Sequence, residues 1–264
     1  MKLKRFVKRN SHNAFFKVLA GFGRALNRHY ENRNHDIYSN GELTVIKKIA
    51  KLEPTIIIDG GANIGKYSTI LTEYCKKANI YSFEPVSNTY KILESNLKGL
   101  KNVHLEMKGL FSENIFKEIN LFPSSTHSSI FEIEGLKHRI RDTTKIELIK
   151  GDDFLKENNI NQLDFIKLDL EGSEYEALLG FKEIISKQNV RMIQFEFGYI
   201  NITTKKLLVD FYNFFNDFGY VLGKVFPKTV EFREYNFIYE DFLGPNFVAV
   251  RKDDEELIRL LTNK

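Results

Sequence analysis

The chain has 264 residues, of which 42% are hydrophobic and 28% are charged. This length can enclose one sizeable core and is too short for two ordinary domains with separate cores. The single cysteine, Cys75, excludes an intramolecular disulfide framework and a cysteine-rich zinc site. No run approaches the roughly 18–20 apolar residues of a membrane span, and Lys17 and Arg24 interrupt the N-terminal apolar stretch. We therefore expect a cytoplasmic protein whose N-terminus is retained.

The net charge of +4 is unevenly distributed along the chain. Residues 1–33 carry nine basic side chains and one acidic side chain, Glu31, whereas residues 34–264 carry 30 basic and 34 acidic groups. At 100° per residue, the apolar side chains between residues 15 and 30 share one helix face, and Lys17, Arg24 and Arg28 lie on the other. We expect this basic amphipathic helix to dock its apolar face on the main domain. The alternative is peripheral contact of residues 11–30 with the anionic inner face of a membrane.

Strand and helix patterns alternate along the main part of the chain. Short apolar strands are predicted at residues 55–58, 80–83, 103–107, 165–169 and 191–197, and helices at 42–51, 87–97 (with Ser87 as N-cap), 173–185 and 207–218. This order predicts an α/β fold with five parallel strands, and residues 221–226 and 246–250 add an antiparallel pair, which makes a seven-stranded sheet. Residues 113–150 break the pattern and are predicted to form an inserted hairpin or edge region. The predicted divisions are a helical extension (1–41), the main domain (42–252) and a C-terminal tail (253–264).

A glycine turn follows the first predicted strand and opens a helix, which lets a ligand approach the backbone there. The spacing Gly60, Gly61, Gly65 differs from the G-x-G-x-x-G of dinucleotide-binding proteins. Asp59 would repel a pyrophosphate, but it suits the ammonium of a methionine moiety. Glu84, at the end of the second strand, can accept hydrogen bonds from both hydroxyls of a ribose. These residues favour S-adenosylmethionine as the ligand.

Four segments taken together resemble the FkbM-type methyltransferases: IDGGANIG at 58–65, FEP at 83–85, IKLDLEGSE at 166–174 and NF at 246–247. The resemblance spans residues 42–251. It implies a class I, Rossmann-like fold that uses S-adenosylmethionine to methylate a hydroxyl of a sugar, glycan or secondary metabolite. It further implies that Asp59, Gly61 and Asn63 line the methionine end and that Glu84 holds the ribose. The complete predicted cofactor site comprises Asp59, Gly61, Asn63, Gly65, Glu84, Leu110 and Asp169.

Methyl transfer to a hydroxyl requires an aligned acceptor and removal of its proton. Lys167, Asp169 and Glu171 alternate with period 2, so they point to one side if the strand continues to Glu171. We expect Lys167 to pair with a carboxylate and Asp169 to be the leading catalytic acid, with Glu171 as a further candidate. The alternative for Glu171 and Glu174 is that they cap the helix that follows.

Two more catalytic candidates lie elsewhere in the sequence. Glu196 falls near the end of the fifth parallel strand, so it can face the same cleft as Asp169. In one version of the mechanism Asp169 and Glu196 bind a divalent cation, such as magnesium or calcium, which lowers the pKa of the acceptor hydroxyl. His127 can act as a base; the alternative is a solvated loop histidine.

The acceptor is expected to be a small molecule or glycan. Tyr199 and residues 232–242 can wall its pocket with aromatic side chains, although these side chains can also belong to the core, as we expect for the phenylalanines of 211–218. A nucleic-acid methyltransferase is a rival, but the main domain is mildly acidic, so no nucleic acid is expected. Other small-molecule methyltransferases, and a non-catalytic module that binds S-adenosylmethionine or a membrane, are the remaining alternatives.

Overall fold

An eight-stranded sheet forms the centre of the computed structural model, which describes residues 2–122, 128–132 and 137–263. The strand order is β11-β10-β12-β9-β8-β1-β2-β3. The strands are β1 (Ile56–Gly60), β2 (Asn79–Phe83), β3 (Val103–Glu106), β8 (Leu163–Leu168), β9 (Val190–Glu196), β10 (Tyr220–Val225), β11 (Val230–Phe232) and β12 (Asn246–Arg251). The strands from β3 to β9 are parallel, and β12 and β10 continue the sheet antiparallel, which confirms the predicted Rossmann-like α/β fold. The predicted count of seven strands is too low, because β11 is only three residues long and pairs with β10 alone.

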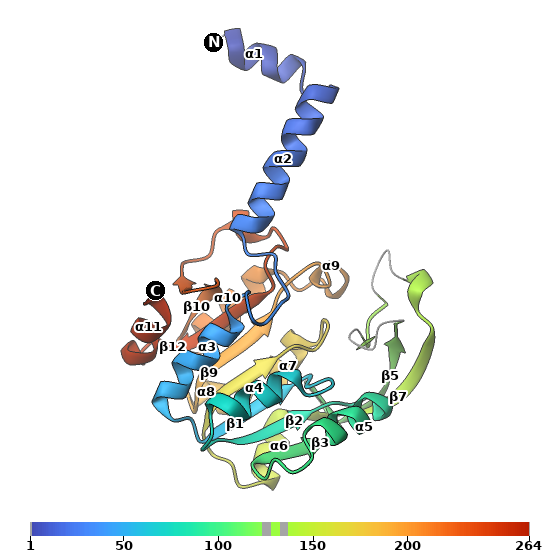
Figure 1. The fold of residues 1–264 in the computed structure, drawn as a ribbon, viewed down its shortest axis with the longest axis vertical. Helices are drawn as coiled ribbons and strands as arrows, with labels where there is room; N and C mark the ends of the chain where they lie inside the picture. Colours follow the sequence, from blue (N-terminus) through green and yellow to red (C-terminus); the bar gives the residue numbers. More distant parts are fainter. Residues whose placement is uncertain (1, 123–127, 133–136, 264) are drawn as a thin grey trace.

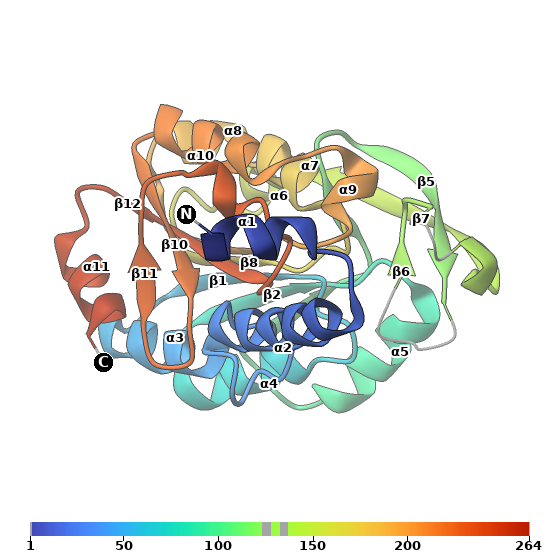
Figure 2. The same cartoon turned by 90° about the horizontal axis from the view of Figure 1, so that it is seen from above.

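Helices cover both faces of this sheet (Figure 2). One face carries α6 (Gly151–Glu157), α7 (Glu174–Gly180), α8 (Lys182–Ser186) and α10 (Leu208–Asp217); the other carries α3 (Glu42–Ile49) with η1 (Ala50–Leu52), α4 (Lys66–Tyr74), α5 (Ser87–Asn96) and α11 (Glu255–Thr262). Phe211 and Phe215 are buried, and the Phe195 and Phe211 rings stack with centroids 4.7 Å apart, which confirms the predicted aromatic core. The helix predicted at 173–185 is instead two helices that meet at buried Phe181, and Val86, not Ser87, is the N-cap of α5.

A second, smaller sheet occupies the region where an inserted hairpin is predicted. It has the order β4-β7-β5-β6 and consists of β4 (Gly109–Phe111), β5 (Ile115–Leu121), β6 (Ser128–Ser129) and β7 (Asp142–Lys150), with η2 (Lys137–Arg139) before β7. β5 and β7 pair antiparallel along the full length of β5. The buried side chains of Ile119, Ile146 and Leu148 pack against Phe111 and Val86. This sheet therefore closes one side of the region beyond the end of β2.

The N-terminal helices α1 (Lys2–Arg9) and α2 (Ala14–Tyr30) project away from the domain (Figure 1). No residue of α2 is buried, and Val18 and Phe22 are 71% and 63% exposed. The prediction that the apolar face of this helix docks on the domain is therefore wrong. No helix in the described part of the chain is long and apolar enough to span a membrane.

The predicted boundaries at both ends of the main domain also need correction. Ile37 is buried among the core residues of the α3 face, so the chain joins the domain before residue 42. The predicted tail contains α11, whose Leu257 and Leu261 are buried in the same cluster. Two short helices, α9 (Asn201–Thr204) and η3 (Phe237–Tyr239), lie in the connections before α10 and β12.

Candidate active site

The glycine turn lies between the ends of β8 and β2. The N–H groups of Gly61 and Ala62 donate to the Phe83 carbonyl at 3.1 and 2.8 Å. Gly61 has φ +77°, and a Cβ there would lie 1.9 Å from the backbone oxygen of Asp169, so only glycine fits without a shift of the backbone. Gly65 also has positive φ, but it packs against α5 and does not line the neighbouring pocket. Its predicted role in cofactor binding stays a prediction, and in the fold it turns the chain into α4.

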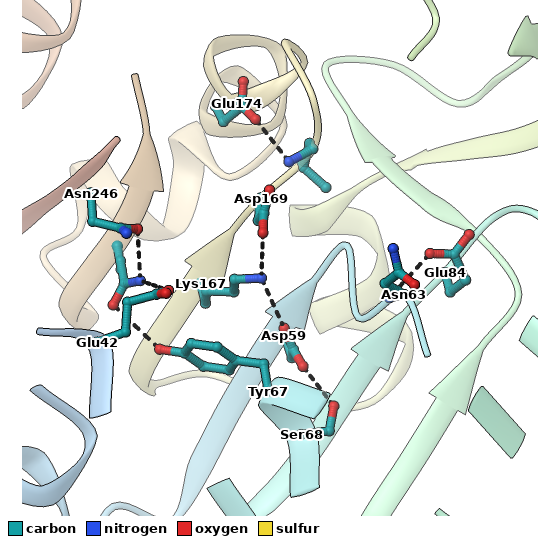
Figure 3. Close-up of polar contacts among 12 residues, drawn as sticks. Glu42, Asp59, Asn63, Tyr67, Ser68, Glu84, Lys167, Asp169, Glu174 and Asn246 are labelled. Carbon is teal, nitrogen blue, oxygen red and sulfur yellow. Dashed lines mark hydrogen bonds and ion pairs between the residues drawn. The ribbon is translucent and has the colours of Figure 1, made fainter. Parts of the chain in front are cut away.

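A buried charged cluster of Asp59, Lys167 and Asp169 lies beside the turn (Figure 3). Asp59 is fully buried; its Oδ2 accepts from the Ser68 hydroxyl at 2.6 Å, and its Oδ1 lies 3.8 Å from Lys167 Nζ. Lys167 Nζ also lies 3.1 Å from Asp169 Oδ2, which confirms the predicted pairing. Burial raises the pKa of the Asp59 carboxyl and Lys167 opposes this; burial lowers the pKa of Lys167, but the carboxylates of Asp169 and Asp59 raise it above its usual value.

The arrangement corrects the predicted role of Asp59. Its side chain points into the cluster and does not line the pocket beyond the turn. In this geometry the Asp59 side chain therefore does not reach a methionine moiety in that pocket. Asp59 instead fixes the Lys167 ammonium, and Lys167 in turn fixes the Asp169 carboxylate at the pocket wall.

Glu84 follows β2 and is 7% exposed. Its Oε2 accepts from the Asn63 N–H at 3.2 Å and its Oε1 accepts from the Val86 N–H at 2.9 Å. A carboxylate oxygen has two lone-pair sites, so each oxygen retains capacity to accept one hydroxyl. Burial raises the pKa of Glu84 to about 7, although the two backbone N–H groups oppose the shift.

One pocket collects most of the predicted cofactor residues. Gly61, Asn63, Glu84, Leu110 and Asp169 line it, and the space within it, including the open mouth, is about 750 Å³. Apolar side chains from the second sheet (Ile119, Ile146 and Leu148) and Ile130, directly after β6, close it. These residues fit S-adenosylmethionine: the carboxylates suit its cationic end, Glu84 can accept the ribose hydroxyls, and the apolar wall suits a base. We call this the cofactor pocket.

A second pocket adjoins the cofactor pocket, and Glu171 lines both. Its wall also includes Arg33, His35, Glu196, Tyr199 and Phe242. Of the aromatic wall that the sequence predicts, Tyr199 and Phe242 line this pocket, whereas Tyr235 and Tyr239 pack against the core. We call this the outer pocket.

The loop that carries Glu171 is not a continuation of the strand. β8 ends at Leu168, and Glu171 has φ +50°, so the predicted period-2 alignment of Glu171 with Lys167 is wrong. Glu174 holds this loop by accepting from the N–H groups of Leu170 at 2.7 Å and Gly172 at 3.0 Å. Glu174 therefore holds the loop before α7 and does not cap the helix as the alternative predicts, and the turn carries Glu171 to the boundary between the two pockets.

A family model described as the methyltransferase FkbM domain matches residues 59–222. The chain belongs to the FkbM methyltransferase family. A hexuronic acid methyltransferase, AglP, from Haloferax volcanii is 26% identical over 174 residues, which cover 64% of this chain and 68% of AglP. Methyltransferase sdnD from Sordaria araneosa is 28% identical over 157 residues, covering 48% of this chain and 60% of sdnD. The crystal structure of methyltransferase FkbM from Methylobacillus flagellatus KT aligns with TM-score 0.48 and 16% identity over 87% of this chain and 60% of that one.

Three carboxyl groups of this FkbM methyltransferase have raised pKa values where the pockets meet. Burial, and then the charges of Asp169 and Glu174, raise the pKa of Glu171 to about 8. Burial raises the pKa of Glu174 to about 7 and that of Glu196 well above its ordinary value, and Asp169 adds to both shifts. Among the described residues no three His, Cys, Asp or Glu side chains are grouped to hold a metal, so Asp169 and Glu196 gain no third ligand. His127 lies outside the described residues.

A polar network behind the outer pocket includes residues that sequence reasoning missed. Gln194 Nε2 donates to Glu42 Oε1 at 2.8 Å and to Asn246 Oδ1 at 3.2 Å, and the Tyr67 hydroxyl donates to Gln194 Oε1 at 3.3 Å. Asn246 on β12 is paired in register with Glu196 on β9. The only sequence signal was Asn246 in the NF segment, because the pairing of Glu42 with a glutamine of β9 depends on the tertiary fold.

Proposed function

We propose that this FkbM methyltransferase transfers the methyl group of S-adenosylmethionine to a hydroxyl of a saccharide or secondary metabolite. The observation that carries the proposal is the position of Glu171, which lines both the cofactor pocket and the outer pocket. A side chain at that boundary can act on an acceptor in the outer pocket while it stays next to the cofactor. The relation to AglP, a hexuronic acid methyltransferase, supports a sugar acceptor.

In this proposal the cofactor pocket orients S-adenosylmethionine through its own side chains. Glu84 accepts hydrogen bonds from the ribose hydroxyls, and Leu110 packs against the base. The turn at Gly61 and Asn63, with Asp169, surrounds the methionine end. The cofactor supplies a methyl group on a sulfonium, whose transfer leaves a neutral thioether.

The outer pocket would hold the acceptor. The exposed ring of Tyr199 suits the apolar face of a sugar ring, and the Arg33 guanidinium at the same wall suits the carboxylate of a sugar acid. Glu171 takes the proton of the acceptor hydroxyl as the oxygen forms its bond to the methyl group. A pKa of about 8 suits this role, since a general base works best when its pKa lies near the operating pH. Asp169, the leading acid on sequence grounds, is held by Lys167 and positions the reacting groups.

The test is transfer of labelled methyl from S-adenosylmethionine to free uronic acids, neutral sugars, total glycans and RNA, with the wild type and Glu171→Gln. We expect labelled saccharide, and a turnover about 10²–10⁴-fold lower in the variant with the affinity for S-adenosylhomocysteine nearly unchanged. The wild-type turnover should rise with pH through about 8, and this rise should be absent in the variant. Glu157→Gln, an exposed glutamate on α6, is the matched control.

Three outcomes would count against this proposal. Normal turnover of Glu171→Gln would remove Glu171 from the mechanism. Labelled RNA in place of labelled saccharide would favour a nucleic-acid methyltransferase. Cofactor binding without product in every arm would favour the non-catalytic module. Loss of turnover in excess chelator would instead revive the divalent-cation version with Asp169 and Glu196.

A further inference from the structure

The N-terminal helices form an arm, residues 2–30, with an uncovered apolar stripe. On α2 the stripe consists of Phe15, Val18, Leu19, Phe22, Leu26 and Tyr30, which are 48–74% exposed. On α1, Phe6 and Val7 are also exposed. Lone exposed apolar residues are ordinary, but a continuous stripe on a projecting helix marks a surface for interaction.

The base of the arm is fixed to the domain. Glu31, which follows α2, accepts from Lys224 Nζ at 2.6 Å, and both side chains are largely buried. Asn32 Nδ2 donates to the backbone oxygens of Asn40 at 2.7 Å and Val225 at 3.0 Å. Glu31 is the one acidic residue among residues 1–33, and its carboxylate pairs with Lys224 of the domain. The arm itself therefore presents basic side chains and no acidic one.

The fixed base lies against the outer pocket. Arg33 and His35, directly after the arm, line this pocket. Gly244, another lining residue, approaches the base of the arm so closely that a Cβ there would lie 2.0 Å from the backbone oxygen of Glu31. The direction of the arm and the mouth of the outer pocket are therefore set by the same few residues.

We propose that the arm binds the surface of an anionic lipid bilayer and holds the outer pocket toward acceptors at that surface. The apolar stripe enters the boundary between head groups and acyl chains, and the basic side chains are attracted by anionic head groups. A second copy of the chain fits this face less well, since it would bring two wholly basic arms together. The second half of the proposal rests on the proposed function and makes the acceptor class a saccharide or hydroxyl compound attached to a membrane lipid.

The first experiment measures co-sedimentation of the full chain with vesicles of phosphatidylglycerol and phosphatidylcholine, and with vesicles of phosphatidylcholine alone. We expect binding to the anionic vesicles that weakens with salt. Val18→Glu/Phe22→Glu should lower the partition coefficient more than about a hundredfold, because it removes two apolar side chains from the stripe. Ile92→Glu/Phe116→Glu, which changes two exposed apolar side chains elsewhere, should bind like the wild type.

The second experiment changes charge and keeps the stripe. Lys17→Glu/Arg24→Glu/Arg28→Glu should weaken binding to the anionic vesicles at least about tenfold; these side chains lie opposite the stripe, so each contributes less than a lysine or arginine at the head groups. The same charge change placed on the domain as a triple glutamate variant of exposed lysines should have little effect; these lysines are Lys91, Lys98 and Lys101.

Several results would overturn the proposal. Equal pelleting of the wild type and the Val18→Glu/Phe22→Glu variant would show that the stripe does not bind lipid. Equal binding to both vesicle types would show that anionic head groups do not contribute to binding. A lipid-free dimer in analytical ultracentrifugation that this variant abolishes would assign the stripe to a second copy. Calorimetry with S-adenosylmethionine and a thermal melt of the variant check that the domain itself is intact.

The acceptor half is tested with a uronic acid glycolipid in anionic vesicles against the same uronic acid in solution. We expect the wild type to methylate the vesicle-bound acceptor faster, and the Val18→Glu/Phe22→Glu variant to lose only this advantage. Equal wild-type rates on both acceptors would overturn this half. Vesicle binding without methylation of either acceptor would instead count against the proposed function and leave the lipid contact standing.

Discussion

Replacement of Glu84 by glutamine tests the ribose contact directly. In the structure each carboxylate oxygen already accepts one backbone N–H, from Asn63 and Val86, so ribose hydroxyls need the remaining lone pairs. The amide offers only one oxygen, and its NH₂ cannot accept. A charge-assisted hydrogen bond contributes about 1.5–3 kcal/mol, so loss of one such bond should weaken S-adenosylmethionine at least about tenfold. Isothermal titration calorimetry at pH 8 measures the affinity, and Glu106→Gln, one strand away, is the matched control.

The pH dependence sharpens this test. Burial raises the pKa of Glu84 to about 7, and the ionised form accepts the ribose hydroxyls. Its ionised fraction rises from about one tenth at pH 6 to about nine tenths at pH 8, so its contribution to affinity should grow about tenfold over that interval. Stability follows the opposite sign: a folded pKa above the unfolded value stabilises the apo protein at low pH, and this stabilisation is lost as pH rises through 7. An unchanged affinity in Glu84→Gln, or an unchanged pH slope, would refute the assignment.

Three further variants test the elements around the cofactor pocket. Lys167→Met should lower the free energy of unfolding by about 3–5 kcal/mol in urea titrations at pH 8, because it leaves Asp59 buried without its cation, and by less at pH 5, where protonation relieves that charge; an equal loss at both pH values would contradict this. Gly61→Ala should abolish measurable cofactor binding in calorimetry, whereas Gly99→Ala, with a similar φ of +90° and open space around it, should cost only backbone strain of about 1–3 kcal/mol. Tyr199→Ala should raise the acceptor KM up to about tenfold with the cofactor affinity unchanged, and a changed cofactor affinity would move Tyr199 out of the outer pocket.

The features that follow from local pattern were predictable. Apolar runs that end in Gly60, Glu84 and Asp169 predicted parallel strands, and parallel strands bring their carboxyl ends to one edge. The sequence alone thus predicts that Glu84 and Asp169 share one pocket and that Lys167 pairs with a carboxylate. These predictions needed only the period of the strand and the direction of the sheet.

The features that depend on distant contacts were not predictable in the same way. Asp59 has the position expected of a ligand-binding acid, but the register of β1 with β8 places it beside Lys167 and turns it into the core. The path of Glu171 depends on Glu174, which closes a turn that period-2 reasoning cannot represent. The second sheet depends on pairing between β5 and β7 across the region 123–136. The sequence predicts that the arm docks on the domain because an apolar stripe on a helix usually packs against a core. No local sequence pattern shows that other elements already cover that core.

The charge balance where the pockets meet implies a preference for a cationic ligand. The charge of Lys167 is paired with Asp59 and Asp169. Burial and neighbouring carboxylates raise the pKa values of Glu171 and Glu174, which favours their protonated forms. A sulfonium bound beside these carboxyl groups would stabilise their ionised forms. The neutral thioether that remains after methyl transfer would not stabilise them. The ratio of the affinities for S-adenosylmethionine and S-adenosylhomocysteine should therefore increase at least about threefold between pH 6 and pH 8, as the carboxyl groups ionise more readily beside the cation. Calorimetry with both ligands measures this ratio, and Glu171→Gln should reduce its pH dependence. A ratio that does not change with pH would mean that the carboxyl groups do not sense the charge of the cofactor, and the preference for a cation would then have to come from Asp169 alone.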